Sequence, residues 1–101
     1  RILLVDICRL LYLRAEQKYV TARTVEREYL LDDSLVRLEE SYPGRFLRIH
    51  RNCLVARKAI AGIEREAGEG EGRWLVVLAG LDEHLPISRR QWPSVKAILD
   101  I

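Results

Sequence analysis

The sequence has few of the residues that build disulfide frameworks, metal sites and membrane spans. It contains two cysteines and two histidines, with no C-x-x-C pair and no metal-ligand spacing among the four. No apolar run approaches the roughly 20 residues that cross a bilayer, and the opening RILLVD lacks the pattern of a secretory signal. We therefore expect no disulfide scaffold, metal, cofactor or membrane contact, and a location in the reducing cytoplasm.

Groups for catalysis and for stacking on single-stranded bases are equally scarce. Ser88 lacks the local pattern of a nucleophile elbow, and we infer no paired carboxylates beside an apolar cleft. Aromatic residues make up 7% of the chain, and Tyr12, Tyr19, Phe46 and Trp74 fall at core-like positions rather than in a basic-aromatic stripe. These absences argue against an enzyme and against a reader of single-stranded RNA.

The chain is long enough for one modest core. It has 101 residues, of which 49% are hydrophobic, so we expect a single domain over 1–101. The missing initial Met and the abrupt apolar start indicate a piece of a longer protein.

Short apolar or β-branched runs, bounded by turn residues, predict a mostly β fold. The glycine-rich segment 67–74 is expected to be a mobile hairpin loop, because its glutamates would repel a phosphate. The expected strands cover residues 1–5, 8–15, 19–24, 28–31, 46–49, 53–56, 59–66, 73–78 and 85–87.

Two segments change to helical spacing. Residues 32–44 predict a mid-chain helix that Asp33 or Ser34 caps and that Pro43 and Gly44 end. The last segment predicts a terminal helix with Ser88 as a plausible N-cap, although Pro93 indicates a broken first turn before a helix running from Ser94.

Charge is segregated along the chain although the net charge is only +2. Residues 41–63 and 84–99 contain no Asp or Glu, whereas acids gather in 26–40 and 64–71. A nearly neutral protein with this pattern can present one strongly positive face. Scattered solvated cations, paired with nearby acids, remain the alternative.

The segment FLRIHRNCLVARK, residues 46–58, places cations within two apparent strands. Its apolar residues would anchor the strands, the alternating cations would face the opposite side, and the HRN tip would point at DNA. Guanidinium groups grip phosphates or read guanine, and the amide of Asn52 suits adenine. We expect Cys53 to be a small buried strand residue rather than a low-pKa thiol.

Three blocks resemble the LytTR family of DNA-binding domains: YLRAEQKYVTART, LDDSLVRLEESYPGRFLRIHRNCLVARKAI and PISRRQWPSVKAIL. Together they cover almost the whole chain, and RFLRIHRNCLVARKAI is the most specific. The resemblance implies an elongated arrangement of small antiparallel β-sheets with a mid-chain and a C-terminal helix. Ala56 departs from the family, in which many members carry Asn, so the turn that follows is expected to be looser.

The resemblance also implies a function. It points to the output domain of a bacterial two-component response regulator, which binds double-stranded DNA through loops in the major groove. An N-terminal receiver domain in the full-length protein and a homodimer on direct-repeat sites are the expected partners. The alternative that we keep is a cationic module that docks an acidic protein.

The residues carried over from the family lie in three loops. The expected base contacts are Lys18, Arg51, Asn52 and Arg90, and His50 supports the loop from beneath. The expected phosphate contacts are Arg48, Arg57, Lys58, Ser88 and Arg89.

Overall fold

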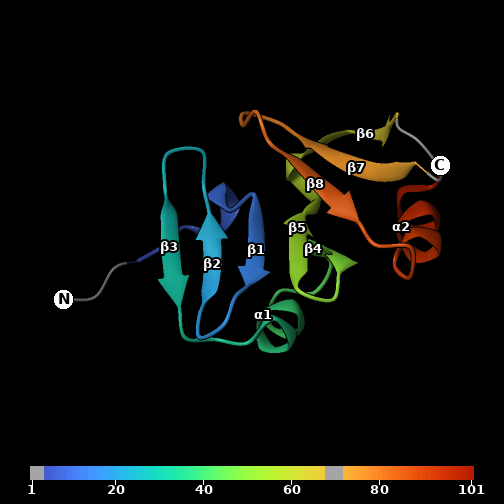
Figure 1. The fold of residues 1–101 in the computed structure, drawn as a ribbon. Helices are drawn as coiled ribbons and strands as arrows, with labels where there is room; N and C mark the ends of the chain where they lie inside the picture. Colours follow the sequence, from blue (N-terminus) through green and yellow to red (C-terminus); the bar gives the residue numbers. More distant parts are fainter. Residues whose placement is uncertain (1–3, 68–71) are drawn as a thin grey trace.

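The computed structural model describes residues 4–67 and 72–101. Two antiparallel sheets and two α-helices form the fold, as expected for a mostly β domain with a mid-chain and a C-terminal helix (Figure 1). The elements in chain order are η1 (Ile7–Arg9), β1 (Tyr12–Ala15), β2 (Val20–Arg23), β3 (Glu28–Leu31), α1 (Leu35–Ser41), β4 (Phe46–His50), β5 (Cys53–Ala56), η2 (Arg57–Ala59), β6 (Ile60–Glu66), β7 (Arg73–Leu78), β8 (His84–Ile87) and α2 (Trp92–Leu99).

The larger sheet has five strands in the order β3-β2-β1-β5-β4. Strand β1 pairs with β2 on one side and with β5 on the other, so Leu13 faces both Ala22 and Leu54 across the ladder. All three of these side chains are completely buried. These three residues therefore lie at the buried centre of the sheet. The loops that connect its strands lie at the two ends of the sheet.

The smaller sheet, β6-β7-β8, extends the molecule to 48 Å in length against widths of 26 and 25 Å. The backbone N–H of Ser88, just after β8, donates to the carbonyl of Ile49 at the end of β4. Val76 and Leu85 of this sheet belong to the same core as the first sheet. One continuous core therefore fixes the end of β8 beside the end of β4.

The two strands around the HRN tip are more deeply buried than alternation predicts. In β4, Arg48 and His50 are half-buried, and in β5 all four residues are buried. Arg48 and His50 alternate with Leu47 and Ile49 along β4, as expected, but both are half-buried rather than open to solvent. The alternating cations are thus partly enclosed by the fold.

Helix α1 begins where the capping signal predicted. The Ser34 side chain accepts the backbone N–H of Arg37 at 3.2 Å, so Ser34 rather than Asp33 is the N-cap. Leu35 is buried, and the helix ends before the turn at Pro43 and Gly44, whose φ of 78° is a left-handed conformation that glycine adopts without strain.

The terminal helix starts earlier than expected. Helix α2 begins at Trp92 with Gln91 as its N-cap, and Pro93 lies within its first turn. The expected break was wrong, because a proline in the first turn gives up an N–H that has no intrahelical partner anyway. Ser88 instead shapes the preceding turn, where its Oγ accepts the backbone N–H of Gln91.

The amino-terminal part differs from the predicted strands. Residues 1–3 lie outside the described residues, and Leu4 and Val5 are not in a strand. Cys8 and Arg9 form a short 3-10 helix because the Asp6 side chain caps the N–H of Cys8 at 2.9 Å. The expected strand over 8–15 is therefore confirmed only from Tyr12 onward, and half of the predicted loop over 67–74 (residues 68–71) also lies outside the described residues.

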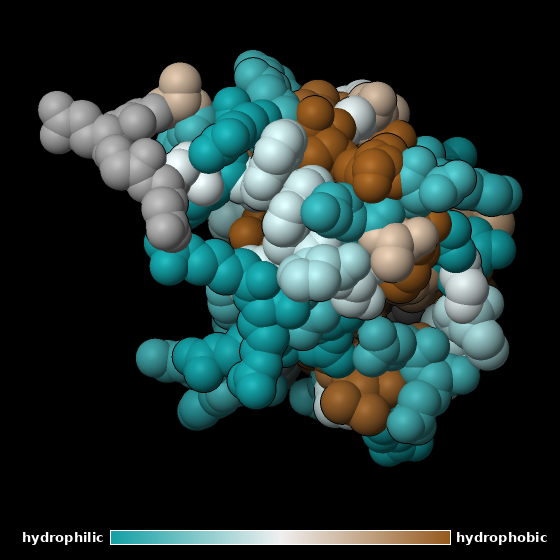
Figure 2. Space-filling model, turned by 90° about the vertical axis from the view of Figure 1, so that its right-hand side faces the viewer, coloured by the Kyte–Doolittle hydropathy of each residue, from teal (hydrophilic) through white to brown (hydrophobic). Residues whose placement is uncertain are grey.

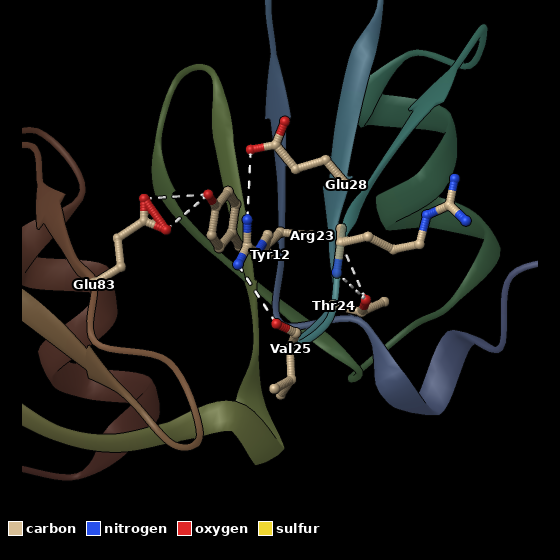
Figure 3. A network of polar contacts seen from close by, with 7 residues as sticks. Tyr12, Arg23, Thr24, Val25, Glu28 and Glu83 are labelled. Atoms are coloured by element: carbon tan, nitrogen blue, oxygen red, sulfur yellow. Dashed lines mark hydrogen bonds and ion pairs between the residues drawn. The ribbon is translucent and has the colours of Figure 1, made fainter.

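A polar network joins the two sheets at one end of β1 (Figure 3). The hydroxyl of Tyr12 donates to Glu83, in the β7–β8 turn, at 2.8 Å. Burial, followed by this hydrogen bond, raises the pKa of Tyr12 to about 12. Tyr19, which we expected in the core, is 46% exposed and belongs to the loop between β1 and β2.

Candidate nucleic-acid interface

Three loops meet at one end of the larger sheet. The backbone N–H of Ala15, before the first loop, donates to the carbonyl of Asn52 in the β4–β5 turn at 2.8 Å. The N–H of Ser88 donates to the carbonyl of Ile49 at 2.9 Å and places the β8–α2 segment beside the same turn. We call residues 16–19, 51–52 and 88–90 together the three-loop edge.

The three-loop edge is strongly positive for its size. Lys18, Arg51, Arg89 and Arg90 are exposed on it, and Glu16 is its single carboxylate, which gives a formal charge of +3. Among residues 4–67 and 72–101, Lys18, Arg51 and Arg90 have no ion-pair partner. The alternative that Arg51 and Arg90 are neutralised by neighbouring acids therefore finds no support in the described residues.

Arg48 holds the β4–β5 turn from within the sheet. Its Nη1 donates to the carbonyl of Arg51 at 2.6 Å, and its Nη2 lies 3.1 Å from a carboxylate oxygen of Glu39 on α1. Only 19% of the Arg48 side chain is exposed. The guanidinium thus bridges helix and turn, and its charge is already paired.

His50 contacts the same turn from the other side. Its Nδ1 accepts the backbone N–H of Asn52 at 3.4 Å, and both side chains are half-buried. A neutral imidazole with the proton on Nε2 is the form that can accept this bond. Arg48 and His50 together fix the carbonyl of Arg51 and the N–H of Asn52.

The third loop borders a groove of about 490 Å³ between β8, β7 and α2. Ser88, Arg89 and His50 line it, together with Trp74 and Trp92, whose rings stack with centroids 4.7 Å apart. The stacked pair fixes the start of α2 against β7. The position of Arg90 therefore rests on aromatic packing and not on the Ser88 turn alone.

Two further arginines, which the sequence patterns did not indicate, lie near the three-loop edge. Arg14 is half-buried and lines a cavity with His50 and Asn52, and its guanidinium lies over the Tyr12 ring at 4.9 Å. Arg65 is exposed and lines the groove beside Ser88. Strand alternation places Arg14 on the same face as Tyr12, and this pattern could have indicated its position. Arg65 gave no such signal, because it stands between two glutamates in the sequence.

Arg57 and Lys58 are not part of this surface. They form η2 at the far end of β5, five or more residues from Asn52. At about 3.3 Å per strand residue, this separation along the strand is roughly 16 Å. Cys53 is buried within β5, and burial raises its pKa to about 11, so the thiol is not activated.

The described part of the chain offers neither a metal cluster nor a membrane-crossing helix. In residues 4–67 and 72–101, no three His, Cys, Asp or Glu side chains are placed to hold a metal ion. No described helix has the length and apolar character to cross a membrane. From the side of α2, the surface is largely hydrophilic with separate hydrophobic patches (Figure 2).

Comparison with known proteins agrees with the family resemblance. The model of a family described as the LytTr DNA-binding domain matches residues 1–100. The positive alginate biosynthesis regulatory protein (AlgR) of Pseudomonas aeruginosa PAO1 is 38% identical over 97 residues, which are 95% of this chain and 38% of that protein. The expected family resemblance is confirmed, and the chain spans well under half of the length of this regulator.

The fold also matches a solved structure. The LytTr DNA-binding domain of a Bacillus cereus protein described as a methyl-accepting/DNA response regulator superposes with a TM-score of 0.82. The match covers 96% of this chain and 86% of the other at 22% identity. At this identity the likeness shows the fold alone.

Proposed function

This chain belongs to the LytTR family of DNA-binding domains, and we propose that it recognises a specific double-stranded sequence by inserting the three-loop edge into the major groove. The groove of B-DNA is about 12 Å wide and presents a distinct pattern of donors and acceptors for each base pair. Short loops on a rigid sheet can enter it without a recognition helix.

The observation that carries the proposal is the meeting of three loops on which Lys18, Arg51 and Arg90 have no acid partner among the described residues. Lys18, Arg51 and Arg90 come from segments more than 30 residues apart, yet backbone hydrogen bonds at 2.8 and 2.9 Å fix their loops to one another. A fixed set of donors is what base reading requires, because each misplaced donor loses its hydrogen bond.

Arg51 is the principal base reader in this proposal. It is exposed at the tip of the turn, and Arg48 and His50 hold the peptide group that links it to Asn52, so its guanidinium can reach O6 and N7 of a guanine from a fixed backbone. Lys18 and Arg90 flank it and read or approach adjacent base pairs. The half-buried Asn52 contributes its amide from the base of the turn.

The remaining residues either contact the DNA phosphates or hold the loops in position. Arg89 contacts phosphate, and Ser88 shapes its turn and presents the hydroxyl beside it. We assign Arg48 and His50 to positioning of the turn, because their side chains already contact Arg51, Glu39 and Asn52. Arg57 and Lys58 lie at the other end of β5, so we assign them no phosphate contact in this proposal.

The wider setting is also a proposal. The relative AlgR is a regulator much longer than this chain, and the Bacillus cereus neighbour is described as a response regulator. We therefore place this chain as the output domain of a cytoplasmic two-component regulator with an amino-terminal receiver domain. Two copies would occupy direct-repeat sites, each reading one half-site.

Selection from random duplexes tests the proposal. The domain is incubated with the pool, bound duplexes are recovered over several rounds, and the affinity for the enriched site is measured by fluorescence anisotropy at two salt concentrations. We expect a short direct repeat to be enriched and its affinity to fall steeply with salt, because bound phosphates release counterions. Equal recovery of all sequences would contradict specific reading and would favour an acidic protein partner for the basic surface.

A further inference from the structure

A second cationic site lies at the end of β5 opposite the three-loop edge. There η1, the turn before β4 and η2 enclose a half-open groove of about 330 Å³. Leu10, Leu11 and Ala59 form part of an apolar lining, and Arg45, Arg57 and Lys58 add three cations to it. This groove is separate from the proposed DNA-reading surface.

The three cations lack a counter-charge in the described structure. None of the described residues that line the groove is acidic, and neither Arg45, Arg57 nor Lys58 forms an ion pair with a described carboxylate. Arg45 is half-buried, and its guanidinium donates to the Cys8 sulfur at 3.7 Å. Asp6, next to the groove-lining Ile7 in the sequence, keeps its negative charge and accepts the N–H of Cys8 through one oxygen, but it does not line the groove. Elsewhere in the described chain, Arg23, Arg48 and Arg73 are each paired with a glutamate.

The walls of the groove are held in place by the backbone. The N–H of Arg57 donates to the carbonyl of Arg45 at 2.9 Å, and the N–H of Ala56 donates to the carbonyl of Leu11 at 2.8 Å. The N–H of Ala79 donates to the carbonyl of Ala59 at 2.8 Å and closes another side. A ligand would therefore meet a formed site and would have little backbone to order.

We propose that this groove binds a small organic anion with an apolar body and a carboxylate or phosphate group. The apolar floor would hold the body, and the guanidinium and ammonium groups would hold the anion through charge-assisted hydrogen bonds. The volume lies at the lower end of the range for small-molecule sites, which are largely apolar with a few convergent polar groups. The proposal does not depend on DNA binding.

Geometry favours a small ligand over the DNA of the three-loop edge. The groove and the β4–β5 turn are at opposite ends of the four buried residues of β5, roughly 16 Å apart. The groove is therefore formed by other residues than those proposed to read bases.

Phenyl phosphate is a suitable probe because it joins an apolar ring to a dianion. It is titrated into the chain while backbone amide chemical shifts are followed, with phenol and inorganic phosphate as probes that lack the charge or the ring. We expect saturable shifts for Cys8, Arg45 and residues 57–59, and weaker binding of either partial probe. Lys58→Glu, at an exposed position, is expected to weaken phenyl phosphate roughly tenfold, the equivalent of one lost charge-assisted contact.

Arg37→Glu is the matched control, because it makes the same charge change at an exposed position on α1. It should change the affinity for phenyl phosphate less than twofold. Equal weakening by both variants, equal binding of phenol, or an absence of saturable shifts at these amides would overturn the proposal. Tighter binding of a short glutamate-rich peptide at the same amides would overturn it in favour of an acidic protein. Shifts of these amides with duplex DNA would overturn it in favour of a second DNA contact.

Discussion

Substitution of Arg48 tests whether this residue positions the DNA-reading turn or contacts a DNA phosphate. Arg48→Ala removes the bond to the Arg51 carbonyl and the ion pair with Glu39. A hydrogen bond from a charged group contributes about 1.5–3 kcal/mol, and a partly exposed ion pair adds little, so we expect the turn to lose about 2 kcal/mol of local stability. If all of this loss reached the bound complex, affinity for the selected duplex would fall by about thirtyfold, which is the upper limit.

The assay is a salt titration of affinity for the selected duplex. A positioning role leaves the slope of log K against log salt unchanged, whereas loss of a phosphate contact lowers its magnitude by about 0.9. Arg37→Ala controls for the loss of one positive charge, since that side chain is exposed on α1. A lower slope for Arg48→Ala than for Arg37→Ala would refute the positioning role.

Glu39→Gln is a second test of the positioning role of Arg48. The change in charge and the loss of the support for Arg48 predict opposite changes in DNA affinity. Loss of a carboxylate near the DNA should tighten binding to any duplex, whereas loss of the support for Arg48 should weaken specific reading. We expect the ratio of specific to non-specific affinity to fall. An unchanged or higher ratio would show that the bridge does not matter for recognition.

Three further predictions concern the frame and the excluded cations. Lys58→Ala should leave the salt slope for the selected duplex unchanged, because Lys58 lies in η2, and a slope lower by about 0.9 in magnitude would return it to the phosphate contacts. Ser34→Ala should lower the free energy of unfolding in urea by about 1 kcal/mol through loss of the α1 cap, and Ser34→Asp should retain most of it. Because the pKa of Tyr12 is about 12 in the fold and 10.0 without it, the protonated hydroxyl favours the folded state below pH 10, and this contribution is lost as the pH rises through 12. Tyr12→Phe should flatten urea stability across that range, and an equally steep decline in the variant would contradict the assignment.

The strands of the larger sheet were predictable where local signals agreed. Segments such as 28–31 and 53–56 combine β-forming residues with clear turns, and both are strands in the structure. The errors came from contacts that periodicity does not report. Asp6 caps a 3-10 turn where an apolar run predicted a strand, and α2 starts at Trp92, whose ring packs on Trp74 of the smaller sheet.

The family resemblance indicated the three loops of the candidate interface and His50 as a support, but not the support from Arg48. Motif resemblance placed Lys18, Arg51 and Arg90 in three separate loops, and the sheet order then showed that these loops meet. The partner of Arg48 is Glu39 on α1, a pairing that depends on how the helix packs and leaves no pattern in the sequence. For the same reason Arg57 and Lys58, close to the HRN tip along the chain, could not be separated from it before β5 was seen to run between them.

The affinity of Arg51→Ala for the selected duplex tests the central claim most directly. Specific reading by the three-loop edge predicts a loss of about 1–3 kcal/mol, together with relaxed preference at one base pair of the site, because one guanidinium reads one base step. Binding as tight and as selective as that of the unmodified chain would contradict the claim and would place the DNA-reading surface elsewhere on the molecule.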